Sequence, residues 1–333
     1  MRAVYINEYG GTDVLEVKEV EDSPSPRSGE VRVKVAAAAL NRADILQRRG
    51  LYPPPSGYPE RIPGLEFAGT VESVGEDVDR FEIGERVFGI IPGGAQAEML
   101  VTGQDQLSRV PAGLELVSAA AIPEAFITAH DAMITQGGLK KGETVLIHAV
   151  GSGVGLAALQ LANVAGARTI GTSRTNEKLE RCEQMGLDVA ISAEEHRNFA
   201  DVVQKATEGV GADVILDLVG AKYLSQNIKS LAVKGRLLLV GLVGGAAAEL
   251  DMRLVLQKRA TLIGTVLRGR SGAEKEEVTS AFERDVIPHL ESGAISPNVD
   301  RVFPIDEIRD AHEYLESNES FGKVVIRIAG NDQ

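Results

Sequence analysis

The segment from Thr144 to Val164 constrains the fold more than any other part of the chain. It reads TVLIHAVGSGVGLAALQLANV, a short apolar run followed by Gly151, Gly153 and Gly155 and then by an apolar helical pattern. This order predicts a strand, a tight turn and a helix, with which proteins bind the pyrophosphate of a dinucleotide. Glycine lets the backbone approach the phosphates, and the N–H groups at the helix start stabilise their charge. The spacing differs from the strict G-x-G-x-x-G pattern, so the surrounding sequence has to decide.

Composition limits the classes of protein to consider. A chain of 333 residues has the length of two domains, and its 44% hydrophobic and 25% charged residues are typical of a globular protein. The net charge of −13 argues against nucleic acid or an anionic membrane as the main partner. No apolar run approaches the roughly 20 residues that span a bilayer, and the N-terminus lacks the apolar core of a signal peptide. The single cysteine, Cys182, excludes an internal disulfide, and we expect a cytoplasmic location.

Two patterns of secondary structure follow one another along the chain. Up to about residue 120 the pattern is β-rich, with strands expected at 31–35, 64–71 and 85–91. After that point, strands and helices alternate, and the alternation predicts a parallel sheet with helices on both faces. The expected strands are 145–149, 168–172, 188–191, 213–218 and 236–240, and the expected helices are 155–165, 176–185, 196–207 and 222–232.

The end of the chain returns to the first pattern. The alternating run at 323–328 predicts a strand that rejoins the β-rich part. We therefore predict an α/β protein in which a β-rich domain, residues 1–122 and 290–333, is interrupted by a doubly wound parallel-sheet domain, residues 123–289.

The residues after the second strand of the doubly wound domain indicate which dinucleotide it takes. Folds specific for NAD place an acidic residue at this strand end, where it binds the ribose 2′-hydroxyl. Here Ser173, Arg174 and Lys178 occupy the region, and no carboxylate sits at the strand end. Hydroxyl and cationic donors suit a 2′-phosphate, so the sequence favours NADPH. The alternatives are that the two cations belong to a solvated helix start and that Glu177 faces the ribose.

Five ordered motifs together resemble a known family. They are MRAVYINEYGG with LEVKEV, AAAALNRADILQRRG, PGLEFAGTV, GERVFG and HAVGSGVGLAALQLA. The chain is similar to the medium-chain dehydrogenase/reductase superfamily, and most similar to its zinc-independent quinone oxidoreductase branch. The segments NRADILQRRGLYPPP and GTVLRGR resemble the stress-inducible NADPH:quinone oxidoreductase subgroup. The resemblance implies a chaperonin-like (GroES-like) catalytic domain beside a Rossmann cofactor domain.

The chain departs from the zinc-dependent alcohol dehydrogenases of that superfamily. Asn41 stands where those enzymes carry a zinc-binding cysteine, Leu65 stands where they carry a histidine, and Glu124 lies near the third ligand. Two of these three side chains cannot bind zinc, and the four-cysteine structural lobe is missing, so we expect no metal. Without a Lewis acid, alcohol oxidation is disfavoured, whereas a quinone or an enone delocalises the incoming charge itself.

Few polar groups remain to steady the charge on a reduced acceptor. Asn41 is expected to donate through its amide and Tyr52 through its phenol, because relatives place this segment at the nicotinamide cleft. The alternatives are a turn-forming Asn41 and a Tyr52 packed at the base of a loop. Asp44 is expected to orient backbone or Arg42 rather than to move protons. His148 is expected in the core, and His196, His289 and His312 on helix surfaces.

Further cofactor contacts follow from strand order and from the resemblance. Ligands of open parallel sheets bind beyond the carboxyl ends of the strands. Together with the turn and the strand-end cations, Gly241, Leu242 and Val243 complete the expected site, and relatives add Leu267 and Lys323. The alternative for Lys323 is an exposed strand residue. The whole set is Gly151, Ser152, Gly153, Val154, Ser173, Arg174, Lys178, Gly241, Leu242, Val243, Leu267 and Lys323.

Three functions remain open on the sequence. The first is an NADPH-dependent reductase of small quinones, and the second is a reductase of enones or enoyl thioesters. The third is a dinucleotide-binding protein without significant turnover. In each case we expect a small-molecule partner rather than nucleic acid or a membrane. The resemblance also implies a homodimer, with an edge strand near 262–266 as its seam.

Overall fold

The computed structural model describes residues 1–196 and 198–328. Contacts within the chain divide it into two units. Unit 1 comprises Met1–Ile127 and Leu267–Gln333, and unit 2 comprises Thr128–Val266. The first boundary lies near the predicted one at residue 123, whereas the second lies well before the predicted residue 290. Within the described residues, no helix is long and apolar enough to cross a membrane.

A seven-stranded sheet forms the frame of unit 1. Its strand order is β14-β15-β3-β4-β5-β7, with β6 also paired to β3, and β1 and β2 form a separate two-stranded sheet. The alternating valines 31, 33 and 35 of β3 are buried because every second side chain points into the core. The strands are β1 (Arg2–Ile6), β2 (Leu15–Glu19), β3 (Glu30–Ala39), β4 (Glu66–Val74), β5 (Arg86–Ile90), β6 (Met99–Gly103), β7 (Leu107–Arg109), β14 (Val299–Pro304) and β15 (Lys323–Arg327).

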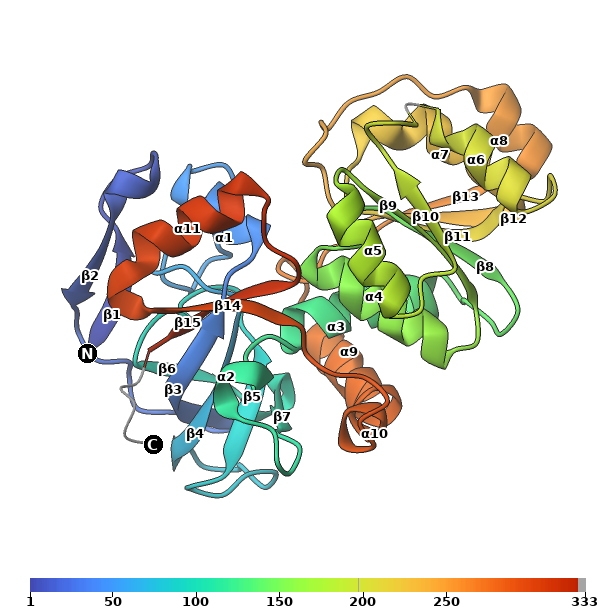
Figure 1. Ribbon diagram of the computed structural model, residues 1–333. Helices are drawn as coiled ribbons and strands as arrows, with labels where there is room; N and C mark the ends of the chain where they lie inside the picture. The colour runs from blue at the N-terminus through green and yellow to red at the C-terminus, as the bar shows by residue number, and fades with distance from the viewer. Residues whose placement is uncertain (197, 329–333) are drawn as a thin grey trace. The chain divides into compact units, whose positions relative to one another are not determined.

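Helices cover this frame with their apolar faces. Helix α11 buries Ile308, Ala311 and Leu315, which helical spacing places on one side, and it lies beside α1 and β2 (Figure 1). The helices are α1 (Arg42–Arg48), α2 (Leu116–Ala119), α3 (Pro123–His130), α9 (Gly272–Asp285), α10 (Ile287–Glu291) and α11 (Ile308–Ser317). Of these, α3 carries the chain from unit 1 into unit 2.

Helix α9 explains why the second boundary differs from the predicted one. The ring of Phe282 packs edge-on against Phe88, with centroids 6.0 Å apart. The Arg80 guanidinium binds both oxygens of Glu283 at 2.8 Å. Since Phe88 and Arg80 belong to unit 1, residues 267–289 pack with the β-rich unit rather than with the doubly wound one.

Unit 2 is a six-stranded parallel sheet with the order β10-β9-β8-β11-β12-β13. This is the doubly wound order of dinucleotide-binding folds, in which the chain switches direction between the first and fourth strands. Helices α4 and α5 lie together over one part of the sheet, and α6, α7 and α8 form a second group (Figure 1). The elements are β8 (Thr144–Ile147), α4 (Gly153–Val164), β9 (Arg168–Ser173), α5 (Asn176–Gln184), β10 (Val189–Ser192), α6 (Phe199–Ala206), β11 (Ala212–Asp217), α7 (Leu224–Ser230), β12 (Leu231–Leu239), α8 (Met252–Lys258) and β13 (Thr261–Gly264).

One predicted boundary in unit 2 is wrong. The helix expected at 222–232 ends at Ser230, and β12 begins at Leu231 rather than at 236. Leu231 pairs with Ala212, after which the register shifts, and Lys234 adopts a left-handed conformation with φ of 66°. Because this irregular stretch interrupts strand alternation, its residues lack the pattern by which a strand is predicted.

Candidate active site

The loop after β8 has the geometry expected of a phosphate-binding turn. Ser152 precedes α4 as its N-cap, and its Oγ accepts the N–H of Gly155 at 3.1 Å. The N–H groups of Gly153 and Val154 belong to the first helical turn, where they precede the first intrahelical hydrogen bond. A Cβ on Gly155 would lie 2.4 Å from the Ala149 oxygen, so only glycine lets α4 start this close to the strand. Gly151, Ser152, Gly153 and Val154 thus lie where the sequence places them, at the carboxyl end of β8.

Buried hydrogen bonds join the ends of β8, β9 and β11 beneath this loop. The Asp217 carboxylate accepts the N–H groups of Val219 at 2.7 Å and Gly220 at 2.9 Å, and the Asn227 amide at 2.9 Å. Asn227 Oδ1 lies 2.6 Å from Nε2 of His148, whose Nδ1 lies 2.8 Å from Thr172 Oγ1. The network fixes the loops at the point where strand order reverses.

Burial sets the charge of two members of this network. It lowers the pKa of His148 to about 4, against the hydrogen bond to Asn227, which raises it. Burial also raises the pKa of Asp217, while its backbone N–H partners lower it. His148 is fully buried and its ring packs against Phe199 and Tyr223, which confirms the prediction that it is a core residue.

No carboxylate follows β9 at its carboxyl end. Ser173 is the last residue of β9 and is buried, Arg174 is exposed directly after it, and Lys178 is half-buried in the first half of α5. Glu177 is exposed in the first turn of α5, and the Asn176 amide binds Glu195 at 2.7 Å. Hydroxyl and cationic groups therefore stand at this strand end, as the sequence predicts.

The loop after β12 lies against the loop after β11. The N–H groups of Val240 and Gly241 donate to the Asp217 carbonyl at 2.9 and 3.1 Å, and a Cβ on Gly241 would lie 2.6 Å from the Leu218 oxygen. Leu242 and Val243 follow with exposed fractions of 57% and 68%. Two large apolar side chains thus stand in water at the carboxyl edge of the sheet, where a ligand could cover them.

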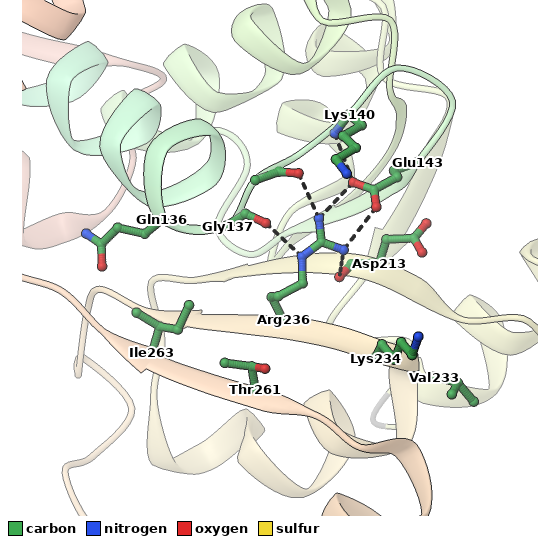
Figure 2. Close-up of a pocket in the computed structure, with 11 residues that line it drawn as sticks. Gln136, Gly137, Lys140, Glu143, Asp213, Val233, Lys234, Arg236, Thr261 and Ile263 are labelled. Carbon is green, nitrogen blue, oxygen red and sulfur yellow. Dashed lines mark hydrogen bonds and ion pairs between the residues drawn. The ribbon is translucent and has the colours of Figure 1, made fainter.

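A different hollow, of about 620 Å³, opens at the opposite edge of this sheet. Arg236 is one of the residues that line it, and Figure 2 shows its guanidinium held by Glu143 and the loop before β8. Its nitrogens bind both Glu143 oxygens at 3.0 and 2.8 Å and the carbonyls of Gly137, Gly138 and Asp213 at 2.7 to 3.2 Å. Because these bonds occupy the guanidinium, and because parallel sheets bind ligands at their carboxyl edge, this hollow is not the dinucleotide site.

In unit 1, Asn41 is committed to its neighbours. Its Nδ2 donates to Glu66 Oε1 at 2.9 Å and to the Ala39 carbonyl at 3.3 Å, and its Oδ1 accepts from Lys323 at 2.7 Å. Direct donation to an acceptor, the role predicted for Asn41, would require one of these hydrogen bonds to break. In this structure the amide orients Glu66 and Lys323.

Lys323 is not the exposed strand residue that the sequence allows as an alternative. Its side chain is buried, and Nζ donates to the Leu40 carbonyl at 2.9 Å, to Asn41 Oδ1 at 2.7 Å and to Glu66 Oε1 at 2.6 Å. The ammonium is therefore directed at Glu66 and Asn41, and its three protons are all used. Leu267, the other residue that relatives suggest, is buried in unit 1.

Asp44 and Glu124 are the acidic neighbours of this ion pair. Asp44 accepts the N–H groups of Asn41 at 2.7 Å and Gly64 at 2.9 Å, which confirms its expected role of orienting backbone. Burial raises the pKa of Asp44 to about 6, although these N–H groups lower it. Burial and, second, the Glu66 charge raise the pKa of Glu124 to about 8. In the sequence, Glu124 stands out only as a position near a zinc ligand of relatives, although a charge inside an apolar helical run was a further signal for it.

Arg268 holds Tyr52 and its loop. The guanidinium lies 4.9 Å from the centre of the Tyr52 ring and donates to the Tyr52 carbonyl at 2.7 Å, to the Pro92 carbonyl at 2.6 Å and to Gln47. Burial raises the pKa of the Tyr52 phenol, and the nearby Glu124 adds to the shift. The predicted residues Asn41 and Tyr52 therefore belong to one polar cluster of unit 1, and the sequence identifies this cluster only in part. The cluster consists of Asn41, Asp44, Tyr52, Glu66, Glu124, Arg268 and Lys323.

His312 contradicts its predicted surface position. It is fully buried, and its Nδ1 lies 3.2 Å from a guanidinium nitrogen of Arg48. Arg48 also binds Glu316 at 2.8 Å, so α11 is tied to α1 by a buried polar contact. The burial of His312 could not be predicted from its neighbours in sequence, because several of them are polar and only a narrow stripe of α11 is buried. Among the described residues, no group of three or more His, Cys, Asp or Glu could hold a metal ion.

Comparison with known proteins identifies the family. The Alcohol dehydrogenase GroES-like domain matches residues 27–135, and the Zinc-binding dehydrogenase domain matches residues 153–284. The quinone oxidoreductase of Lama guanicoe is 31% identical over 329 residues, which cover 98% of this chain and 97% of the relative. The chain belongs to the medium-chain dehydrogenase/reductase superfamily. This membership confirms the predicted fold class, a GroES-like domain plus a dinucleotide-binding domain with a parallel sheet.

Solved structures of the superfamily agree in fold. A mycobacterial protein complexed with NADPH has a TM-score of 0.89 and 30% identity, covering 98% of this chain and 100% of the other. A quinone oxidoreductase of Pseudomonas syringae has a TM-score of 0.87 and 27% identity, covering 98% and 99%. The CurK enoyl reductase has a TM-score of 0.88 and 27% identity, with the same coverage. The neighbours thus include both kinds of reductase expected from the sequence.

Proposed function

We propose that this protein reduces small quinones by hydride transfer from NADPH, without a catalytic metal. Several relatives of nearly full length are quinone oxidoreductases, which supports the acceptor class. Ser173, Arg174 and Lys178 stand where an NAD-specific fold needs a carboxylate, which supports NADPH. An NADPH complex among the structural neighbours is compatible with this choice.

The position of the Lys323 ammonium is the main support for an active site without a catalytic metal. It lies 2.6 Å from Glu66 and 2.7 Å from Asn41, the residue at the position of a zinc-binding cysteine. Structural zinc needs four donors and catalytic zinc three, commonly thiolates and imidazoles. Here an amide and an apolar side chain replace two donors, and a fixed positive charge stands beside the remaining carboxylates. These residues do not fit a zinc ion, whatever the name of the matching domain.

The residues of unit 2 fit a dinucleotide. The N-terminus of α4 would bind the pyrophosphate, and Gly155 and Gly241 keep the backbone close enough for contact. The cofactor supplies the hydride when bound. The Asp217–Asn227–His148 network holds the two loops in place, while Leu242 and Val243 would exclude water from the reacting face.

A second candidate is a reductase of enones or enoyl thioesters, which the likeness to the CurK enoyl reductase supports. The same hydride donor serves both reactions, because an enone also delocalises the added charge.

We include in the proposal a cytoplasmic homodimer. β13 ends the sheet and pairs only with β12 among the described strands, which leaves an edge for a second copy. The single cysteine is buried, and burial raises the pKa of its thiol to about 12.

The test is a panel of acceptors with NADPH and NADH. Purified protein is mixed with ortho-quinones, para-quinones, enones and enoyl thioesters, before and after treatment with a metal chelator. We expect NADPH oxidation with quinones that chelation leaves unchanged. A protein that oxidises neither cofactor with any acceptor would be a dinucleotide-binding protein without turnover, and the proposal would fail.

The choice of NADPH has its own variant. Replacing Arg174 and Lys178 together by Ala should raise the KM for NADPH at least about tenfold and leave that for NADH unchanged, because charge-assisted hydrogen bonds contribute about 1.5–3 kcal/mol each. Lys205→Ala, which removes an exposed cation from α6, is the matched control. An unchanged ratio of the two KM values would show that the 2′-phosphate binds elsewhere.

A further inference from the structure

Glu124 occupies a particular place in the polar cluster of unit 1. It follows Pro123 at the start of α3, and its backbone N–H donates to Glu66 Oε2 at 2.9 Å. Glu66 is fully buried, whereas Glu124 is only partly buried. Glu124 therefore borders a closed ion pair, and part of the residue is accessible to solvent.

The charged groups around Glu124 are already engaged with other partners. Lys323 binds Glu66, Asn41 and a backbone carbonyl, and Arg268 binds two carbonyls and Gln47. Lys275 of α9 donates to the Arg270 carbonyl. Within the described part of the chain, the Glu124 carboxyl makes no hydrogen bond or ion pair. The groups that face it are Glu66, Asp44, Tyr52, Lys323, Arg268 and Lys275.

This setting favours the protonated form of Glu124. Burial disfavours its charge most, Glu66 and Asp44 repel it further, and Lys323 and Arg268 oppose these effects only in part. With a pKa of about 8, the carboxyl carries its proton at neutral pH. A carboxylic acid of this kind can donate a proton that an ordinary surface glutamate has already lost.

Glu66 connects Glu124 to the expected acceptor position. One oxygen of its carboxylate accepts the Glu124 N–H at 2.9 Å, and the other accepts the Asn41 amide at 2.9 Å. The Glu124 charge also raises the pKa of the Tyr52 phenol, whose loop Arg268 holds. Glu124 is thus tied through Glu66 to Asn41, one of the two residues predicted to steady the reduced acceptor.

We propose that Glu124 is the proton donor of this reductase. The inference rests on the proposed function, because it needs an acceptor that becomes an anion. Hydride addition leaves a negative charge on a quinone oxygen. The O–H bond of Glu124 then breaks, an O–H bond forms on that oxygen, and the electron pair stays on the Glu124 carboxylate. Solvent reprotonates Glu124 from its exposed side, so each turnover consumes one NADPH, one proton and one quinone and yields NADP⁺ and hydroquinone.

The decisive variant is Glu124→Gln. Glutamine has the same shape and keeps the backbone N–H to Glu66, but it has no acidic proton. We expect kcat near pH 7 to fall about 100-fold, as removal of a general acid does. Wild-type kcat should fall as pH rises above about 8, whereas the kcat of the variant should be low and independent of pH in that range. Affinity for NADPH, measured by fluorescence titration, should change less than about twofold, since the variant changes no cofactor contact.

A second measurement does not depend on turnover. The infrared carbonyl band of a protonated carboxylic acid should disappear from the wild-type protein as pH rises through about 8 and should be missing from Glu124→Gln. The control is Glu115→Gln, which changes an exposed glutamate before α2 and should leave kcat, its pH profile and the band unchanged.

The outcomes separate the two proposals. An active wild-type protein whose Glu124→Gln variant keeps the wild-type kcat and pH profile would overturn the role of Glu124 and leave the proposed function standing. A wild-type protein that reduces no acceptor would overturn the proposed function and the proton-donor role with it, even if the infrared band titrates as expected.

Discussion

Replacing Lys323 by methionine tests whether the buried ion pair organises the cluster of unit 1. Methionine has a similar length but no charge. The substitution removes the donors to the Leu40 carbonyl at 2.9 Å, to Asn41 Oδ1 at 2.7 Å and to Glu66 Oε1 at 2.6 Å. The side chains of Lys323 and Glu66 are only 7% and 0% exposed, so water cannot replace the lost partners.

The size of the effect follows from this burial. Removing one partner of a buried ion pair destabilises a protein by about 3–5 kcal/mol, because an unpaired charge is left inside. Glu66 keeps two donors, the Asn41 amide at 2.9 Å and the Glu124 N–H at 2.9 Å, which places the expected loss near the lower limit, about 3 kcal/mol. For a domain of this size, 1 kcal/mol corresponds to roughly 2–4 °C in Tm, so Tm should fall by roughly 6–12 °C.

The assay is thermal unfolding of a double-mutant cycle. Glu66→Gln alone leaves the Lys323 ammonium without its carboxylate partner. In the Lys323→Met background the same substitution removes the unpaired negative charge of Glu66. The double variant should therefore be more stable than Lys323→Met by about 1–2 kcal/mol. Lys18→Met is the control, since Lys18 lies 3.4 Å from Glu16 with 38% and 52% of the two side chains exposed. Such a surface pair contributes less than about 1 kcal/mol. A Lys323→Met variant as stable as Lys18→Met, or a cycle without coupling, would refute the reasoning.

Two further predictions concern unit 2. Burial lowers the pKa of His148 to about 4. Since the unfolded chain binds this proton below about pH 6.5, the contribution of His148 to folding stability should fall by roughly 3 kcal/mol as pH drops from 7 to 4. Urea unfolding at both pH values should show a smaller fall for His148→Gln, and an equal fall would contradict the assignment. Gly155→Ala places a Cβ 2.4 Å from the Ala149 oxygen and 2.6 Å from that of Val150, so fluorescence titration should show NADPH binding weakened at least about tenfold. Gly272→Ala, with nothing within 4 Å, should bind NADPH as the wild type does, and equal affinities of both variants would contradict the role of Gly155.

Local pattern was enough to predict most of the elements. The alternation in Val31–Val35 marks β3, and the order strand, glycine turn and apolar helix marks β8 and α4. Both patterns extend over only a few residues, so they can be recognised from residues that are neighbours along the chain. The irregular start of β12 and the placement of α9 in unit 1 were missed, because a register shift has no periodicity and because α9 is fixed by the distant Phe88 and Arg80.

The sequence by itself determined the two folding patterns, the dinucleotide turn at Gly151–Gly155 and the lack of a carboxylate after β9. These are properties of residue types at short, fixed spacings. Only the tertiary structure decided that Lys323 binds Asn41, 282 positions earlier in the chain, and that Arg268 holds Tyr52, 216 positions earlier. It also placed Glu124, a position considered for metal, beside Glu66, where burial raises the pKa of its carboxyl to about 8. The charge and pairing of buried polar groups depend on neighbours brought together by the fold, and no pattern along the chain records them.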